Sequence, residues 1–161
     1  LELACGLGDA TEVLARKIGP RGRILSTDVS AEMLKLAEGR VCAFPEVDIQ
    51  FKQLDASQMR FDQAFDAIIC TLGFSVIPDY EEAIRRAYRA LVPGGRIAVL
   101  DAQLYRKFPF TLLNPFVKML HRLFRAHERD LRAALNNSFD EIAYREYLGG
   151  SYFLYIGQRQ I

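Results

Sequence analysis

Two glycines and a glutamate near the start of the chain form the first group of residues that could bind a ligand. Gly6 and Gly8 follow an apolar run that ends at Cys5, and Glu2 lies inside that run. Glycines at a strand–helix junction allow a sharp turn and leave room for a ligand at the helix N-terminus. The dinucleotide fingerprint G-x-G-x-x-G would place a third glycine where Thr11 stands. The glycine pair alone therefore fits a tight turn as well as a nucleotide loop.

Two aspartates stand at the ends of later apolar runs. Asp28 follows the run 23–27, and Asp55 follows the run 49–54. Each alone could be an ordinary turn or cap residue. An acidic side chain at the end of the second strand can, however, accept hydrogen bonds from both hydroxyls of a ribose. Because the carboxyl ends of parallel strands meet at one crevice, we expect Glu2, the glycines and both aspartates to line a single cleft.

The elements that must position these residues alternate between strand and helix patterns. Ser30 is the expected N-cap of a helix that extends to Val41, and the turn Pro93-Gly94-Gly95 follows another helix. The predicted strands cover 1–5, 23–27, 49–54, 65–70 and 96–100, and the other predicted helices cover 11–18 and 81–91. Such alternation predicts an α/β fold, a mostly parallel Rossmann-like sheet with helices on both faces.

The last third of the chain has a different pattern. Asn114 followed by Pro115 favours a helix start, with the asparagine as its cap. A further helix is predicted at 129–135. The runs 139–147 and 152–158 flank two glycines and indicate an antiparallel hairpin, which brings the sheet to seven strands. We expect one domain over 1–161, with 105–137 as a helical insertion on the substrate side.

Composition excludes several classes of protein. The chain has 161 residues, a net charge of +1 and 50% hydrophobic residues, which is ordinary globular usage and not that of a disordered chain. No apolar run reaches the ~18 residues of a membrane-spanning helix. Three cysteines with no close pairing predict free thiols, with Cys5 and Cys70 buried and inert, and no zinc site.

Taken together, the motifs resemble those of class I S-adenosylmethionine-dependent methyltransferases. The matching segments are E-L-A-C-G-L-G, an aspartate ending the second strand, aspartate-alanine ending the third, F-D-A-I-I, and L-V-P-G-G-R-I-A-V-L-D. Within that family the chain is most similar to the ubiquinone/menaquinone and lipid methyltransferases, through L-N-P-F and the basic, apolar helix that follows. The resemblance implies S-adenosylmethionine as cofactor, and an N-terminal helix that this sequence lacks.

The resemblance also implies a role for each site residue. Glu2 would lie near the amino group of the methyl donor, and Gly6 and Gly8 would pack against its methionine portion. Asp28 would bind the ribose hydroxyls, and Asp55 the adenine amino group. The remaining implied cofactor-binding residues are Ala4 in the loop, Val29, Met33 and Ala56 beside the adenine, and Thr71 near the sulfonium.

Two other functions stay open. One is a catalytically inactive methyltransferase-like module that only binds the cofactor or partners. The other is an NAD(P)-dependent oxidoreductase. Glu2 beside the loop and Thr11 in place of the third glycine argue against a pyrophosphate and favour a zwitterionic amino acid tail.

The expected acceptor is an apolar, lipid- or quinone-like small molecule. Residues 105–132 carry a charge of +5 on a body of −4. One interpretation is an amphipathic helix that covers the sheet. The other is a lid whose apolar face, with Phe108, Phe110 and Phe116, meets the acceptor while Lys118, Arg122 and Arg125 meet anionic head groups. We expect a cytoplasmic protein that contacts the membrane surface under the second interpretation, and no nucleic acid partner.

Methyl transfer from a sulfonium depends mainly on alignment and on the exclusion of water. A general base is needed only if the acceptor must lose a proton. The available groups are His121, His127, Tyr105, Tyr144 and Tyr147. We expect His121 to be solvated and assign no catalytic residue.

Overall fold

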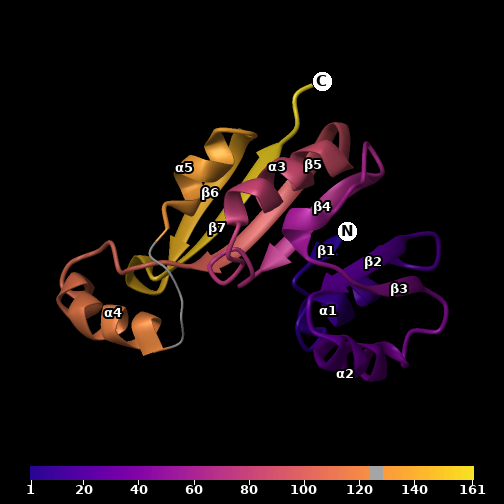
Figure 1. The fold of residues 1–161 in the computed structure, drawn as a ribbon, viewed down its shortest axis with the longest axis horizontal. Coiled ribbons are helices and arrows are strands. Elements are labelled where there is room, and N and C mark those ends of the chain that lie inside the picture. Colours follow the sequence, from indigo (N-terminus) through magenta and orange to yellow (C-terminus); the bar gives the residue numbers. More distant parts are fainter. Residues whose placement is uncertain (124–128) are drawn as a thin grey trace.

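A computed structural model describes residues 1–123 and 129–161 of the protein. Seven strands form one sheet in the order β3-β2-β1-β4-β5-β7-β6 (Figure 1). The strands are β1 (Glu2–Leu3), β2 (Arg23–Asp28), β3 (Asp48–Gln53), β4 (Phe65–Thr71), β5 (Leu91–Ala102), β6 (Asp140–Tyr147) and β7 (Tyr152–Gln158). The α-helices are α1 (Asp9–Ile18), α2 (Ala31–Val41), α3 (Tyr80–Ala90), α4 (Asn114–Leu123) and α5 (Leu131–Asn136), with 3₁₀ turns η1 (Ala56–Gln58), η2 (Phe110–Leu113) and η3 (Leu148–Gly150).

The sheet confirms the predicted fold class. Strands β1 to β5 pair in parallel, and β7 pairs antiparallel with both β5 and β6. The chain order reverses between β1 and β4, which is the topological switch point where open α/β sheets bind ligands. The carboxyl ends of β1, β2 and β4 therefore form one edge of the molecule.

Helices lie on both faces of the sheet. In Figure 1, α1 and α2 accompany β1, β2 and β3, while α3 and α5 lie above β4, β5 and β7. The largest apolar cluster is formed by β4, β5, β7, α3 and α5, and includes Ile68, Val99, Leu135 and Tyr155. This core fixes the positions of the strand ends and therefore the starting points of the loops that follow them.

Most element boundaries differ from the sequence prediction by one or two residues. Helix α1 begins two residues earlier than predicted, and Thr71 is the last residue of β4 rather than the first after it. The predicted turn at 93–95 lies within β5. There the pairing with β4 jumps from Leu91 to Arg96, and Gly94 has a φ of 76°. Residues 93–95 therefore form an irregularity within β5, which begins at Leu91, and do not form the turn that was predicted between the helix and a strand starting at Arg96.

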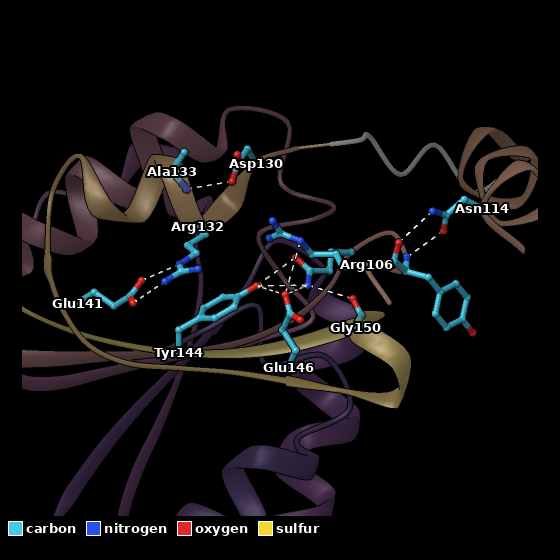
Figure 2. A network of polar contacts seen from close by, with 11 residues as sticks. Arg106, Asn114, Asp130, Arg132, Ala133, Glu141, Tyr144, Glu146 and Gly150 are labelled. Atoms are coloured by element: carbon cyan, nitrogen blue, oxygen red, sulfur yellow. Dashed lines mark hydrogen bonds and ion pairs between the residues drawn. The ribbon is translucent and has the colours of Figure 1, made fainter. Parts of the chain in front are cut away.

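The segment after β5 corrects one expectation about Asn114. Its side chain does not act as the predicted cap but bonds the backbone of Tyr105, accepting from its N–H at 2.9 Å and donating to its carbonyl at 3.0 Å (Figure 2). Helix α4 packs on η2 and is set apart from the sheet, whereas α5 packs on β7 and α3 (Figure 1). Among residues 1–123 and 129–161, no helix is long and apolar enough to cross a bilayer.

Candidate cofactor-binding site

The glycine loop between β1 and α1 has an unusual backbone. Ala4, Gly6 and Gly8 all have positive φ, of 52°, 53° and 82°. A β-carbon on Gly8 would lie 2.8 Å from that of Ala37, so this glycine allows α1 to approach α2 closely. A β-carbon on Gly6 would meet nothing within 4 Å. The loop is therefore packed tightly at Gly8 and has open space at Gly6.

Glu2 lies beneath this loop and is only 2% exposed. Its Oε2 accepts hydrogen bonds from the hydroxyls of Thr11 at 2.5 Å and Ser26 at 2.6 Å. Burial raises the pKa of the carboxyl, and the two hydroxyls oppose that rise. Thr11, at the position of the missing third glycine, thus ties the first helical turn to β1. Glu2 is turned toward the interior, and its contact with a donor amino group stays a prediction.

Asp28 at the end of β2 joins two turns of the site. Its Oδ2 accepts from the backbone N–H of Gly6 at 2.8 Å, and its Oδ1 accepts from that of Ser30 at 2.9 Å. An ionised carboxylate has about four acceptor positions, so each oxygen retains capacity for another donor. The side chain of Asp28 therefore orients the glycine loop and can still bind hydroxyl groups.

Asp55 follows β3 and caps η1. Its Oδ1 accepts from the backbone N–H of Ser57 at 2.8 Å and from its hydroxyl at 2.7 Å. The backbone N–H of Leu54 donates to the carbonyl of Asp28 at 2.9 Å, which brings the ends of β2 and β3 together. Ala56, the next residue, is buried. The expected convergence of Asp28 and Asp55 at neighbouring strand ends is present.

Apolar side chains stand exposed at the same edge. Val29, directly after Asp28, is 67% exposed, and Met33 in the first turn of α2 is 38% exposed. Solvent-exposed apolar groups beside polar strand ends are typical of surfaces that bind a flat, partly apolar ligand. Val29 directly follows β2 and Met33 lies in the first turn of α2; their contact with an adenine stays a prediction.

The loop after β4 is bonded by Asp101 of β5, a residue that was not among the predicted site residues. Asp101, at the carboxyl end of β5, is fully buried and accepts from the backbone N–H groups of Ser75 at 3.1 Å and Ala102 at 2.7 Å. Burial raises the pKa of its carboxyl. Leu72 has a φ of 55°, and a β-carbon on Gly73 would lie 2.8 Å from that of Ala4. The sequence signal that could have identified Asp101 is its place directly after the apolar residues of V-L-D.

A second polar cluster lies beyond β5, on the hairpin. Tyr144 accepts from Nε2 of Gln103 at 3.2 Å, and Gln103 donates to the Gly150 carbonyl at 3.0 Å (Figure 2). Arg106 lies 3.6 Å from Glu146, to which Tyr144 also bonds. Burial raises the pKa of Tyr144, which makes its phenol a weaker acid and disfavours the phenolate. This cluster connects the segment after β5 to the hairpin.

The remaining candidate groups are the cysteines, the histidines and two arginines of the basic segment. Cys5 and Cys70 are buried and Cys42 is exposed, as free thiols, and burial raises the pKa of Cys5 to about 12. The buried thiols match the prediction. The side chains of His121 and Arg122, and all of Arg125 and His127, lie outside the described residues.

Comparison with known proteins identifies a family. The profile of the ubiE/COQ5 methyltransferase family matches residues 1–125. A demethylmenaquinone methyltransferase of Lactobacillus johnsonii is 35% identical over 103 residues, which cover 63% of this chain and 42% of the relative. A 2-phytyl-1,4-naphtoquinone methyltransferase of Thermosynechococcus vestitus is 40% identical over 102 residues, covering 63% and 44%. The matched region thus spans less than half the length of these two relatives.

A solved structure agrees with the fold. The S-adenosylmethionine-dependent methyltransferase of Methanosarcina mazei superposes with a TM-score of 0.77 over 99% of this chain and 91% of that one, at 19% identity. At this identity the likeness concerns the fold alone. The family profile covers most of the chain, including the glycine loop, Asp28, Asp55 and Asp101. The chain belongs to the ubiE/COQ5 methyltransferase family.

Proposed function

We propose that the protein transfers a methyl group from S-adenosylmethionine to an apolar, quinone-like small molecule. The observation that carries this proposal is the meeting of three strand ends at the switch point. There Asp28 accepts from Gly6 while retaining free acceptor capacity, and Gly6 faces open space. The family membership of the chain and the quinone substrates in the names of its relatives support the same activity.

The residues present suit the donor. Asp28 would accept hydrogen bonds from the ribose hydroxyls, and Asp55 one from the adenine amino group. Val29 and Met33 would cover the adenine with apolar surface. The open side of Gly6 would admit the methionine portion, with Ala4 and Gly8 shaping the loop and Thr71 supplying backbone contacts. Ala56 would pack beside the adenine.

S-Adenosylmethionine supplies an electrophilic methyl group on sulfur. The protein's part is to fix the donor at the strand ends and to bring the acceptor into line with it in a site from which water is excluded. The buried Glu2 connects β1 to α1 and β2 through Thr11 and Ser26, and the buried Asp101 accepts from Ser75 in the loop after β4. None of the described side chains is assigned as a general base.

The apolar nature of the proposed acceptor fits the segment after β5. Phe108 is 80% exposed and Leu112 is 71% exposed, and Arg106 and Lys107 are exposed beside them. Large exposed apolar residues mixed with basic ones are typical of surfaces that meet an anionic lipid interface. This segment would contact the membrane in which such an acceptor dissolves, so the protein would be cytoplasmic and peripheral to the membrane.

Binding and turnover test the proposal in sequence. Calorimetric titration with S-adenosylhomocysteine should give saturable binding, while reduced nicotinamide adenine dinucleotide should not bind. Transfer of a labelled methyl group should then occur to a demethylated naphthoquinol and not to a small polar catechol.

Each alternative outcome has a distinct meaning. Binding of S-adenosylhomocysteine without transfer to any quinol would favour the inactive binding module. Selective binding of the nicotinamide dinucleotide would favour an oxidoreductase and refute the proposal.

A further inference from the structure

Arg129, which belongs to no strand, hydrogen-bonds the backbone of the loop that follows β4. Its Nη1 donates to the carbonyl of Phe74 at 2.7 Å and to that of Ile77, and its Nη2 donates to that of Pro78 at 3.4 Å. Its guanidinium also lies 4.5 Å from the centre of the Tyr80 ring. A guanidinium presents five donors in a rigid plane, so one side chain can satisfy several carbonyls of a turn at once.

The same loop is also bonded by Asp101. That buried carboxylate accepts from the backbone N–H of Ser75, while Val76 and Ile77 both donate to the Gly73 carbonyl at 3.0 Å. The backbone of 73–78 is thus bonded by Asp101, which accepts from the Ser75 N–H, and by Arg129, which donates to three carbonyls. Arg129 stands more than fifty residues further along the chain than the loop that it bonds.

The loop starts at the carboxyl edge of the sheet, where the proposed function places the methyl donor. It continues directly from Thr71, and its apolar side chains Leu72 and Val76 are 48% and 56% exposed. Leu72 has a positive φ, and its N–H donates to the Leu100 carbonyl at 2.7 Å, which places it at the carboxyl edge between β4 and β5. Two exposed apolar residues on a fixed backbone are suited to contact an apolar acceptor.

We propose that Arg129 is a positioning residue for methyl transfer, which acts by fixing the 72–78 loop so that Leu72 and Val76 orient the acceptor. The inference rests on the proposed function. It assigns to Arg129 an effect on the acceptor side of the reaction and none of its own on donor binding, because Asp28 and Asp55 stand at the ends of β2 and β3, whereas Arg129 bonds residues after β4. Arg129 touches neither ligand in this role.

Arg132 offers a matched control three residues further on. Its guanidinium makes a paired contact with Glu141, at 2.8 Å for both bonds, and lies 4.0 Å from the centre of the Tyr144 ring (Figure 2). It therefore resembles Arg129 in its type of contacts but binds the hairpin and not the loop. We compare Arg129→Ala and Arg129→Lys with Arg132→Ala.

The first measurement needs no activity. Hydrogen exchange at the amides of 75–77 should become at least ten-fold faster in Arg129→Ala, with and without S-adenosylhomocysteine, and should be unchanged in Arg132→Ala. Arg129→Lys should resemble the alanine variant, because one ammonium cannot reach all three carbonyls in the geometry of a planar guanidinium.

The second measurement uses a demethylated naphthoquinol as acceptor. Arg129→Ala should lower kcat/KM for the quinol at least ten-fold, with a raised KM, while the Kd of S-adenosylhomocysteine changes less than three-fold. Arg132→Ala should leave both values unchanged.

Unchanged exchange in Arg129→Ala, or an equal loss of kcat/KM in both alanine variants, would overturn the inference. Absence of transfer by the unsubstituted protein would instead refute the proposed function, which keeps the two failures distinct.

Discussion

The carboxylate of Asp28 accepts a hydrogen bond from the backbone N–H of Gly6 at 2.8 Å, across 22 residues of sequence. This bond connects the end of β2 to the loop between β1 and α1. The acidic residue expected to bind the donor therefore also shapes the loop expected to surround it. Loss of the carboxylate should affect both functions, through the ligand and through an unpaired backbone donor.

Replacing Asp28 by alanine should abolish measurable donor binding. Hydrogen bonds to charged groups contribute about 1.5–3 kcal/mol each, so loss of two ribose contacts weakens S-adenosylhomocysteine by at least about 100-fold. The unpaired Gly6 N–H should also lower the free energy of unfolding by about 1–3 kcal/mol. Calorimetry and urea denaturation measure the two effects. Asp48→Ala, which removes an exposed carboxylate paired with Arg23, is the control; equal binding by both variants would contradict the site.

Alanine substitutions at three glycines should separate ligand space from packing space. Gly8→Ala adds a β-carbon against Ala37 at positive φ and should destabilise by about 2–4 kcal/mol. Gly6→Ala should lower the free energy of unfolding by about 1–2 kcal/mol because the residue has a positive φ. It should also weaken the binding of S-adenosylhomocysteine to the folded protein, since the added β-carbon enters the open space at Gly6. Gly39→Ala, on α2 with free space around it, should stabilise by about 0.5–1 kcal/mol. Thermal melts and calorimetry would decide; wild-type binding by Gly6→Ala would show that no ligand occupies that space.

The sequence predicted the strand ends better than it predicted what the side chains there do. Asp28 and Asp55 could be placed because apolar runs end before them and parallel strands share one edge. The inward orientation of Glu2 could not, because its partners Thr11 and Ser26 are common polar residues on other elements. Thr11 departs from the glycine fingerprint, and that pattern does not indicate its hydrogen bond to Glu2.

Long-range contacts of charged residues were harder still. Arg129 stands in a basic segment that suggested a solvated or lipid-facing surface, yet its partners are backbone carbonyls. Carbonyl groups occur at every residue, so no sequence pattern marks the ones that a guanidinium will reach. The position of α4 was equally undetermined, because an amphipathic pattern specifies an apolar face but not what covers it.

Glu2 should give the protein a pH dependence of stability that a glutamine removes. Burial raises its pKa in the folded state, so the native protein retains the proton to a higher pH than the unfolded chain does. Above the ordinary value of 4.5, stability should fall with rising pH until the raised pKa is passed. The stability of Glu2→Gln relative to wild type should therefore increase as pH rises, as urea denaturation at several pH values would measure.

Glu12, whose side chain is 27% exposed, provides the opposite sign as a control for this pH effect. The side-chain hydrogen bond from Arg16 lowers the pKa of Glu12, so its contribution is present above 4.5 and is lost as pH falls through the lowered pKa. Glu12→Gln should thus approach wild-type stability at acidic pH. Parallel curves for the two variants would show that Glu2 is not buried as the structure has it.

The segment after β5 should bind anionic membranes through one basic and two apolar residues. Lys107→Glu removes one positive charge near the surface and adds a negative one; at about 1 kcal/mol per charge this weakens partition by roughly ten-fold or more. Phe108→Ser and Leu112→Ser should weaken partition because less apolar area of these exposed side chains would become buried in the membrane. Co-sedimentation with phosphatidylcholine vesicles, with and without phosphatidylglycerol, measures both effects. Arg23→Glu, at the amino end of β2 with an 88% exposed side chain, matches the charge change on a distant surface. Equal partition of Lys107→Glu and Arg23→Glu into the vesicles would exclude this segment as the membrane contact. The exposed phenylalanines and basic residues of the segment would then be left with contact to the acceptor as their proposed role.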